Sequence, residues 1–239
     1  MTARAHIESL LRAKKLDVTL TSASPLDCAA DRHADLVAPV ADAGSGVHIY
    51  DGRAIDAALG GGLRRGHLSE IVGGRSSGRT GVVYRALAAA IGRGELAALI
   101  DTHDRFDPES AAVMGVDLSR LLWVRETGDT GRALKAMNLV LQAGGFGLVV
   151  WDLADAPAMA TRSLPFTTWF RLARVVESSQ TAALVVASEH LARSAGGATI
   201  VMEPADASPA SWIGVRSHRA RLLGGLDVCP RIVTLGAAR

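Results

Sequence analysis

The stretch that decides the fold is residues 68–80, Leu-Ser-Glu-Ile-Val-Gly-Gly-Arg-Ser-Ser-Gly-Arg-Thr, where an apolar run meets a turn rich in glycine and serine. Residues 68–72 are expected to form a short buried strand, and residues 80–91 have the apolar spacing of a helix that Gly92 closes. The turn therefore joins the carboxyl end of a strand to the amino end of a helix. Converging backbone N–H groups and the helix N-terminus favour an anion at such a turn.

Residues 73–80 match the phosphate-loop pattern Gly-x-x-x-x-Gly-Lys-Ser/Thr at every fixed position except the lysine, which is replaced by Arg79. Arginine keeps the charge, but its planar fork is longer and more rigid, so it cannot simply take the place of a lysine. Thr80 keeps the hydroxyl that holds Mg²⁺ in such loops. Asp152 ends the apolar run at 147–151 and could hold a magnesium-bound water. The candidate nucleotide-site residues are Gly73, Ser76, Ser77, Gly78, Arg79, Thr80 and Asp152.

Outward from this loop, apolar strands alternate with amphipathic helices, which predicts an α/β fold with a mainly parallel sheet flanked by helices. A strand-rich tail is expected to extend that sheet with antiparallel C-terminal strands. The expected strands are 96–101, 121–124, 146–151, 182–187, 199–203, 212–217 and 231–235, and the further helices are 108–114, 130–143 and 167–178.

The composition is that of a folded domain: 239 residues, 49% hydrophobic and 21% charged, with a formal net charge of +2. Cys28 and Cys229 have no metal-ligand spacing, so no metal site is expected. No run of about 18 uncharged apolar residues is present, and residues 1–15 lack the apolar core of a signal peptide, which predicts a cytoplasmic protein. Residues 1–45 are expected to form a short helix and a linker arm, and residues 46–239 a core domain.

Several co-linear segments resemble the core of the RecA recombinase family: residues 59–73 around the loop, 101–117 after the second strand and 127–150 before Asp152. The resemblance covers about residues 47–201. It implies a RecA-like core whose loop once bound ATP and magnesium.

Three functional positions depart from that family. Arg79 replaces the lysine, and Ser110 replaces the aromatic residue that stacks on adenine. His103 stands where the family's water-activating glutamate is expected, and the carboxylate of Asp104 is one position further along the chain. Loss of the lysine and the carboxylate predicts negligible ATPase activity, no catalytic residue and at most weak residual binding of ATP or Mg²⁺.

The segments that correspond to the family's two DNA-binding loops, 153–166 and 189–198, are short. Three cations in them could contact phosphate, and a basic run at 217–221 could contact DNA or an acidic partner. Ordinary surface charge is the preferred explanation of these residues, and DNA binding is expected to be weak or absent. The candidate contacts are Arg162, His190, Arg193, Arg219 and Arg221.

A RecA-like chain with eroded catalytic residues resembles the ImuA family of SOS-induced accessory proteins in error-prone translesion synthesis. The resemblance implies as partners an ImuB-type polymerase-like adaptor, an error-prone replicative-type polymerase and RecA itself. The helix at 4–15 could also support self-association. Two alternatives stay open: a DNA-dependent ATPase that uses Arg79 and Asp104 in altered geometry, and an SOS-linked inhibitor of cell division.

Overall fold

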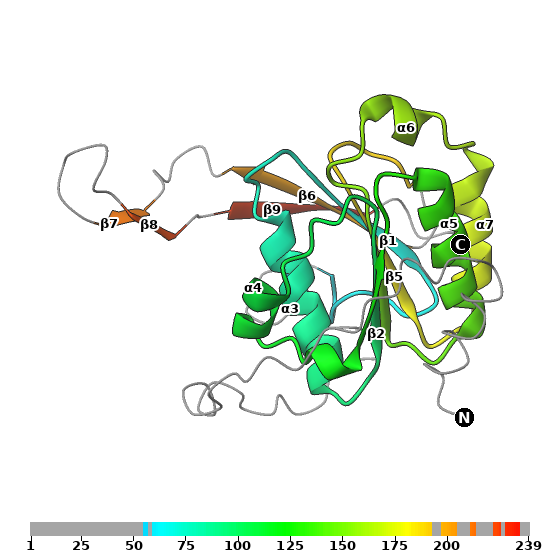
Figure 1. The fold of residues 1–239 in the computed structure, drawn as a ribbon, viewed down its shortest axis with the longest axis horizontal. Helices are drawn as coiled ribbons and strands as arrows, with labels where there is room; N and C mark the ends of the chain where they lie inside the picture. The colour runs from blue at the N-terminus through cyan, green and yellow to red at the C-terminus, as the bar shows by residue number, and fades with distance from the viewer. Residues whose placement is uncertain are drawn as a thin grey trace.

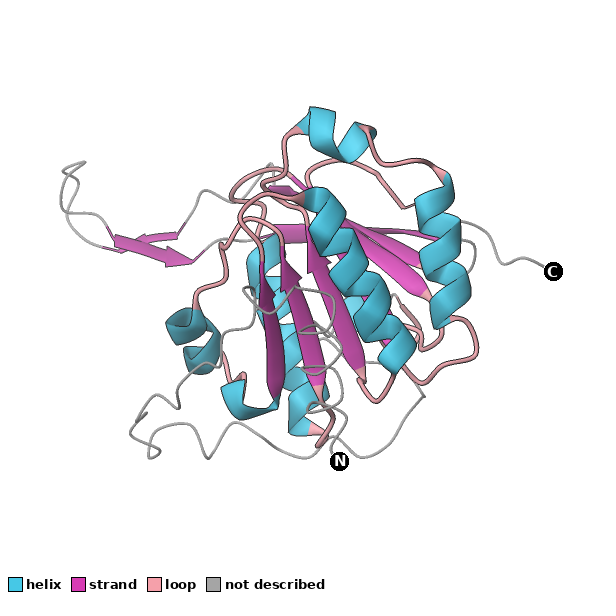
Figure 2. Ribbon diagram, turned by 45° about the vertical axis from the view of Figure 1, so that its right-hand side comes forward, coloured by secondary structure: helices cyan, strands magenta, loops and turns pink. Residues whose placement is uncertain are grey.

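The computed structural model describes residues 55–56, 59–192, 197–204, 211–213, 222–225 and 228–234. A seven-stranded sheet with the strand order β3-β2-β4-β5-β1-β6-β9 forms the centre of the molecule, and helices cover both of its faces (Figures 1 and 2). The strands of this sheet are β1 (Leu68–Gly73), β2 (Ala97–Asp101), β3 (Leu121–Arg125), β4 (Leu148–Asp152), β5 (Ala182–Ala187), β6 (Ala198–Pro204) and β9 (Val228–Thr234). The helices are α3 (Arg79–Gly92), α4 (Pro108–Val113), α5 (Thr130–Ala143), α6 (Ala158–Arg162) and α7 (Thr167–Val176), with a 3-10 turn η3 (Leu118–Arg120).

The central strands β2, β4 and β5 are almost entirely apolar because each is buried on both faces. Side chains alternate across a strand, so Leu99 of β2 packs into one core and Ile100 into the other. The first core lies beneath α3 and α4, and the second beneath α5 and α7. Trp151 of β4 is fully buried in the second core, where its ring lies 5.8 Å from that of Trp169. The predicted α/β architecture is therefore confirmed.

The sheet is parallel from β3 to β6, and only β9 runs antiparallel, beside β6. The expectation that the whole tail pairs antiparallel with the sheet is wrong for β6, which lies parallel to β1. The strand expected at 212–217 is β7 (Ser211–Ile213), which does not join the main sheet. It pairs in a separate two-stranded sheet with β8 (Leu222–Gly225), a strand that the sequence did not predict. The helix expected at 4–15 and the linker arm lie outside the described residues.

Parallel strands bring their carboxyl ends to one edge of the sheet, and loops that follow these ends carry the sites of open α/β proteins. Here the loops after β1, β2 and β4 meet at that edge. Among the described residues, no helix is long and apolar enough to cross a membrane.

Candidate phosphate-loop site

The phosphate loop connects β1 to α3 as the sequence predicts, and its backbone needs glycine at two places. Gly78 precedes α3 with φ 84°, a left-handed conformation that glycine adopts at little cost. Gly73 lies so close to β6 that a Cβ there would come within 2.8 Å of the Met202 carbonyl oxygen and 2.5 Å of the Ser77 hydroxyl oxygen. Ser76 takes φ 59°, and Ser77 is buried. The loop is therefore packed tightly against the end of the sheet.

Arg79, the residue in the lysine position, turns inward. Only 8% of its side chain is exposed. Its Nη1 donates to the carbonyl oxygen of Gly73, at the start of the same loop, and its Nη2 donates to the carbonyl oxygen of Ala154 over 3.2 Å. The guanidinium thus clamps the phosphate loop to the loop after β4, and two of its donors are committed to main-chain carbonyls.

Arg79, Thr80 and Asp152 line one pocket, so the structure brings together the three sequence-predicted residues with ligand-binding side chains. The pocket has a volume of about 70 Å³. Pockets that hold drug-sized ligands measure about 300–1,000 Å³. The enclosed part of this pocket is smaller than such sites.

Asp152 ends β4 and is partly buried. Its Oδ1 accepts the Ala154 N–H over 2.8 Å. Burial raises the pKa of Asp152 from 3.8 to about 6. The nearby carboxylates of Asp101 and Asp155 raise this pKa too, whereas the Ala154 N–H and the Arg79 guanidinium lower it. Asp152 therefore carries its charge at neutral pH only at a cost in folding free energy.

Asp155, three residues after Asp152, is the centre of a charge cluster that the sequence analysis did not identify. The Nε of Arg105 lies 3.4 Å from its Oδ2, while Arg79 Nη2 and Arg75 Nε each lie 3.9 Å from its Oδ1. The three arginines come from the phosphate loop, from α3 and from the loop after β2. The available signal was that Asp155 and Arg105 both follow strands whose carboxyl ends lie at this edge.

Asp101, the last residue of β2, organises the loop that carries Arg105. It is 1% exposed, and its Oδ1 accepts the Arg105 N–H over 3.0 Å while its Oδ2 accepts the Phe106 N–H over 2.8 Å. The Trp123 indole N–H donates to the same Oδ2 over 3.3 Å.

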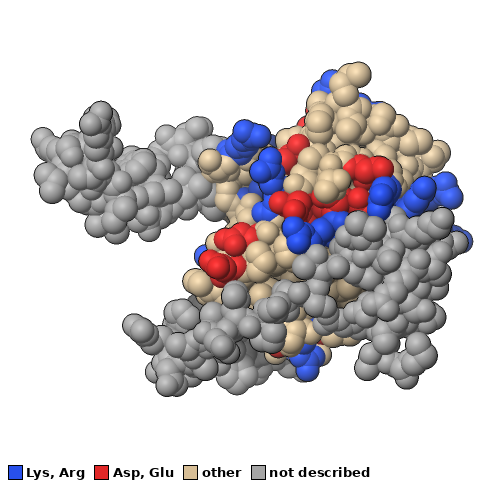
Figure 3. All heavy atoms as spheres, in the orientation of Figure 1, with Lys and Arg blue, Asp and Glu red and all other residues tan. Residues whose placement is uncertain are grey.

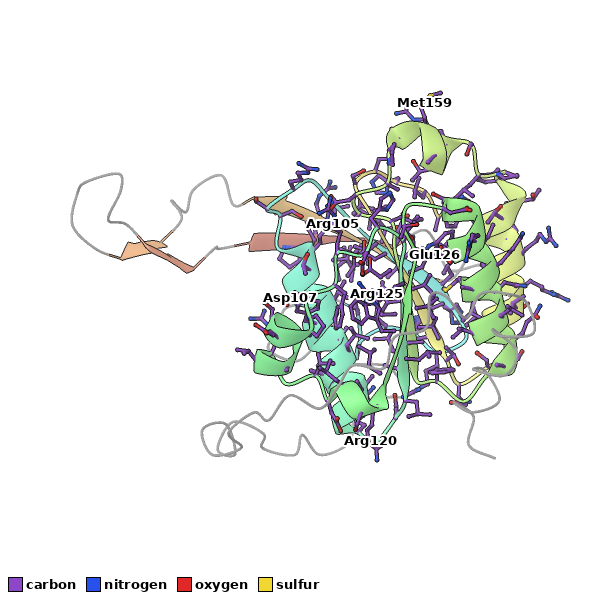
Figure 4. The ribbon with its side chains drawn as sticks, viewed as in Figure 1. Arg105, Asp107, Arg120, Arg125, Glu126 and Met159 are labelled. Atoms are coloured by element: carbon purple, nitrogen blue, oxygen red, sulfur yellow. The ribbon has the colours of Figure 1, made fainter. Side chains whose placement is uncertain are left out.

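Figure 4 shows Arg105, Arg125 and Glu126 toward one end of the sheet and Arg120 at the other.

The positions that depart from the recombinase pattern have other contacts here. Asp104 takes φ 55°, and its two carboxylate oxygens accept from Nε and Nη2 of Arg125, each over 2.6 Å. Its carboxylate is thus bound at the end of β3. His103 lines the pocket, and its buried Nδ1 has no hydrogen-bond partner among the described residues. Ser110 is exposed, and its hydroxyl donates to Asp107, the N-cap of α4.

The candidate DNA contacts that the structure describes are paired with carboxylates. Arg162 of α6 lies 3.1 Å from Oε2 of Glu189, and Nδ1 of His190 lies 3.2 Å from Oε1 of Glu70. Glu70, within β1, is 2% exposed, and its Oε2 also accepts the N–H groups of Leu191 and Ala192. It therefore pins the loop after β5 to the sheet. The other three candidates, Arg193, Arg219 and Arg221, lie outside the described residues.

The described residues contain no group of three or more His, Cys, Asp or Glu side chains that could hold a metal ion. The sheet is mainly parallel, its first strand enters a helix through a glycine-rich loop, and an aspartate ends β4. These features define a phosphate-loop α/β core of the RecA type.

Comparison with known proteins agrees. Residues 45–162 match the family model of the RecA N-terminal domain, and over this region the chain is RecA-like. Two similar proteins are the protein RecA of Arthrobacter sp. (strain FB24), 45% identical over 105 residues, and that of Mycobacterium ulcerans (strain Agy99), 44% identical over 105 residues. Each match covers 43% of this chain and 29% or 30% of the relative. The matching segment thus spans less than a third of the length of these relatives.

Proposed function

We propose that this chain is a non-catalytic RecA-like accessory protein of SOS-induced, error-prone translesion DNA synthesis, and that it acts by binding proteins. The partners proposed are an ImuB-type polymerase-like adaptor, an error-prone replicative-type polymerase and RecA. In this role the phosphate loop is a structural scaffold, and the surface of the domain performs the function.

The single observation that carries the proposal is the inward turn of Arg79. A phosphate-loop lysine acts by presenting a free charge to the β- and γ-phosphates. Here the guanidinium is bound to the carbonyl oxygens of Gly73 and Ala154, inside a pocket of about 70 Å³. Freeing it for a phosphate would leave the buried Gly73 carbonyl and the partly buried Ala154 carbonyl without this donor, which opposes nucleotide binding.

The groups that would have to activate water and hold a base support the same conclusion. Asp104, the carboxylate that an altered mechanism would use, is paired bidentately with Arg125. Ser110 offers no ring for a base to stack on and is bound to Asp107 instead. With Arg79 and Asp104 both bound elsewhere, their contributions to phosphoryl transfer are lost.

A surface suited to protein partners lies on α6 and α7. Met159, Phe166 and Phe170 are 83%, 54% and 52% exposed, and the two phenylalanine rings meet edge to face at 5.0 Å. Met159 points outward from α6 at the top of Figure 4. Residues 156–176 include three arginines and no aspartate or glutamate. Two of these arginines are paired, Arg162 with Glu189 and Arg174 with Glu177, so the surface is mainly apolar. Exposed apolar side chains of this kind fit an apolar segment of a partner protein.

ATP hydrolysis with single-stranded DNA tests the non-catalytic role. We expect no turnover above background for the natural chain, for Arg79→Ala or for Arg85→Ala, a control at an exposed position of α3. DNA-stimulated turnover that Arg79→Ala abolishes and Arg85→Ala preserves would establish the ATPase instead.

Binding to purified partners tests the assignment to translesion synthesis. We expect the chain to bind the polymerase-like adaptor and to leave the tubulin-like division protein unbound. The reverse result would support the inhibitor of cell division.

A further inference from the structure

The amino edge of the sheet, opposite the phosphate loop, carries a row of arginines. Arg65 precedes β1, Arg93 precedes β2 and Arg120 precedes β3. The strands from β3 to β1 are parallel, so the residues that precede them meet at one edge. Figure 4 shows Arg120 at this edge, at the far end of the sheet from Arg105.

Hydrogen bonds join these arginines into one row. Arg120 Nη1 donates to the carbonyl oxygen of Gly94 over 2.6 Å. Next to it, Nε and Nη2 of Arg93 each donate to the Glu95 carboxylate over 3.2 Å. From the other side, Arg65 Nη2 donates to Oε1 of Glu95 over 2.5 Å. Arg65 therefore reaches from the start of β1, across the ends of β5 and β4, to the turn before β2.

The backbone before β4 and β5 makes room for this row. A Cβ on Gly147 would collide with the Glu95 carboxylate, so only glycine lets that side chain lie across the start of β4. Arg65 Nη1 also donates to the carbonyl oxygen of Gln180, before β5, over 2.7 Å. Four strand spacings of about 4.8 Å separate β3 from β1, which makes the row about 19 Å long.

Positive charge is in excess along the row. Its arginines and the carboxylates beside them are Arg64, Arg65, Arg93, Arg120, Glu95 and Asp117. Four positive and two negative charges give a sum of +2. Burial raises the pKa of Glu95, but hydrogen bonds from Arg93 and Arg65 outweigh burial and hold this pKa below its ordinary value of 4.5. The Glu95 carboxylate is therefore charged at neutral pH and belongs in the sum.

The two ends of the row hold the unbalanced charge. Arg64 and Arg120 are exposed, and among the described residues neither is paired with a carboxylate. At the carboxyl edge, by contrast, the three arginines around the pocket are matched by three aspartates. Figure 3 shows acidic and basic side chains beside one another near the centre of the view, without a large area of one sign. Of the two edges, the amino edge therefore attracts a negatively charged partner more strongly.

The row fits carboxylates spaced along a peptide better than it fits a phosphate backbone. A nucleic-acid strand carries a charge about every 3.4 Å, so it would bring phosphates against Glu95 in the middle of the row. A peptide can carry acidic residues at its two ends and neutral residues between them. Six extended residues span about 20 Å, which matches the length of the row. Arginine suits carboxylates because its planar fork donates two parallel hydrogen bonds.

We propose that the amino edge of the sheet binds an acidic segment of a partner protein, in which carboxylates at the two ends of about six extended residues contact Arg64 and Arg120. The inference goes beyond the proposed function, because this surface is separate from the apolar side chains of α6 and α7 and does not depend on the state of the phosphate loop. A polymerase-like adaptor that fails to bind would overturn the proposed function and leave the peptide measurement that follows unaffected.

Fluorescence anisotropy with the full chain tests the inference. The probe is a labelled and capped peptide, Glu-Glu-Ser-Ser-Glu-Glu, and its neutral counterpart is Gln-Gln-Ser-Ser-Gln-Gln. At low ionic strength we expect saturable binding of the acidic peptide and none of the neutral peptide. This binding should be lost in about 1 M salt, where the Debye length is about 3 Å.

A pair of double variants locates the bound peptide. Arg64→Ala combined with Arg120→Ala should weaken binding about fivefold, as the loss of two exposed ion pairs implies. Arg85→Ala combined with Lys135→Ala removes the same charge from exposed positions of α3 and α5 and should leave the affinity almost unchanged. Thermal unfolding of each variant verifies that it is folded.

Three results would overturn the inference. The first is the absence of saturable binding of the acidic peptide to the natural chain, and the second is an equal loss of affinity in the two double variants. The third is a six-nucleotide oligothymidylate that binds more tightly than the peptide and loses more affinity when Arg64 and Arg120 are replaced. That last result would assign the amino edge to nucleic acid.

Discussion

At the scale of single residues, Asp152 combines a position suited to a magnesium ligand with an environment that disfavours its charge. Its pKa of about 6 lies above the ordinary value of 3.8, so between these pH values the folded chain binds more protons than the unfolded chain. The free energy of unfolding attributable to this group is therefore highest below pH 4, falls as the pH rises to 6 and then stays low.

Asp152→Asn should remove this cost, because the amide oxygen can still accept the Ala154 N–H. We expect the free energy of unfolding at pH 7.5 to rise by about 2–3 kcal/mol, as a shift of this size implies. Urea denaturation at pH 4.5 and pH 7.5 measures it, and the gain should be much smaller at pH 4.5. Asp104→Asn is the contrasting control, because hydrogen bonds from Arg125 lower the pKa of Asp104. Loss of this carboxylate should therefore destabilise the folded chain. Equal free energies of unfolding for the natural chain and Asp152→Asn at pH 7.5 would contradict the raised pKa of Asp152.

Two neighbouring glycines of the phosphate loop provide a second matched comparison. Gly73→Ala should destabilise the fold by about 1–3 kcal/mol, the cost typical of forcing a methyl into a packed site, because its Cβ meets Met202 and Ser77. Gly74→Ala adds a methyl where no atom lies within 4 Å and should change little. Chemical denaturation of the two variants checks the packing of the loop against β6, and equal effects would show that the close approach is not maintained in solution.

At the scale of elements, α6 and α7 present apolar side chains to solvent. We expect Phe166→Ser combined with Phe170→Ser to reduce affinity for the purified polymerase-like adaptor at least about tenfold, since central aromatic contacts dominate interfaces. Val113→Ser is the control, because Val113 is 68% exposed on α4, which covers the opposite face of the sheet. Surface plasmon resonance gives both affinities, and an undiminished affinity of the double variant would place the interface elsewhere.

Most elements of the sheet could be predicted from sequence because burial on both faces leaves unbroken apolar runs. The predicted helix at 130–143 matches α5 residue for residue, and the strand at 182–187 matches β5. The five-residue helix α6 was missed, because a single turn has no periodicity to detect. The direction of β6 was also missed, since direction is set by the connection after β5 and leaves no pattern in the strand itself.

The candidate site could be predicted only in part. The phosphate loop and Asp152 belong to a motif with fixed spacing, so their sequence positions were sufficient. Asp155, Arg105 and the paired state of Asp104 depend on how three loops fold over one edge of the sheet. The positive φ of Asp104 and the inward turn of Arg79 follow from such tertiary contacts and have no local signal.

At the scale of the whole molecule, the RecA-like core is preceded by residues 1–45, for which the sequence predicts a helix at 4–15 and a linker. We expect deletion of residues 1–45 to leave the melting temperature of the core almost unchanged and to abolish both self-association and binding to RecA. Analytical ultracentrifugation and a pull-down with purified RecA measure the two properties. Retention of both by the deleted chain would show that the core provides these contacts.

The two outer strands of the sheet differ in their capacity to accept another strand. β9 carries Pro230, which pairs with Met202 of β6 near the middle of the strand. A proline is tolerated in an edge strand when the side that lacks its N–H faces away from the partner. The free side of β9 therefore has a missing donor, and an incoming strand would lose a ladder bond there. Among the described strands, β3 forms the other edge and has no proline, so growth of the sheet between molecules would be favoured on that side.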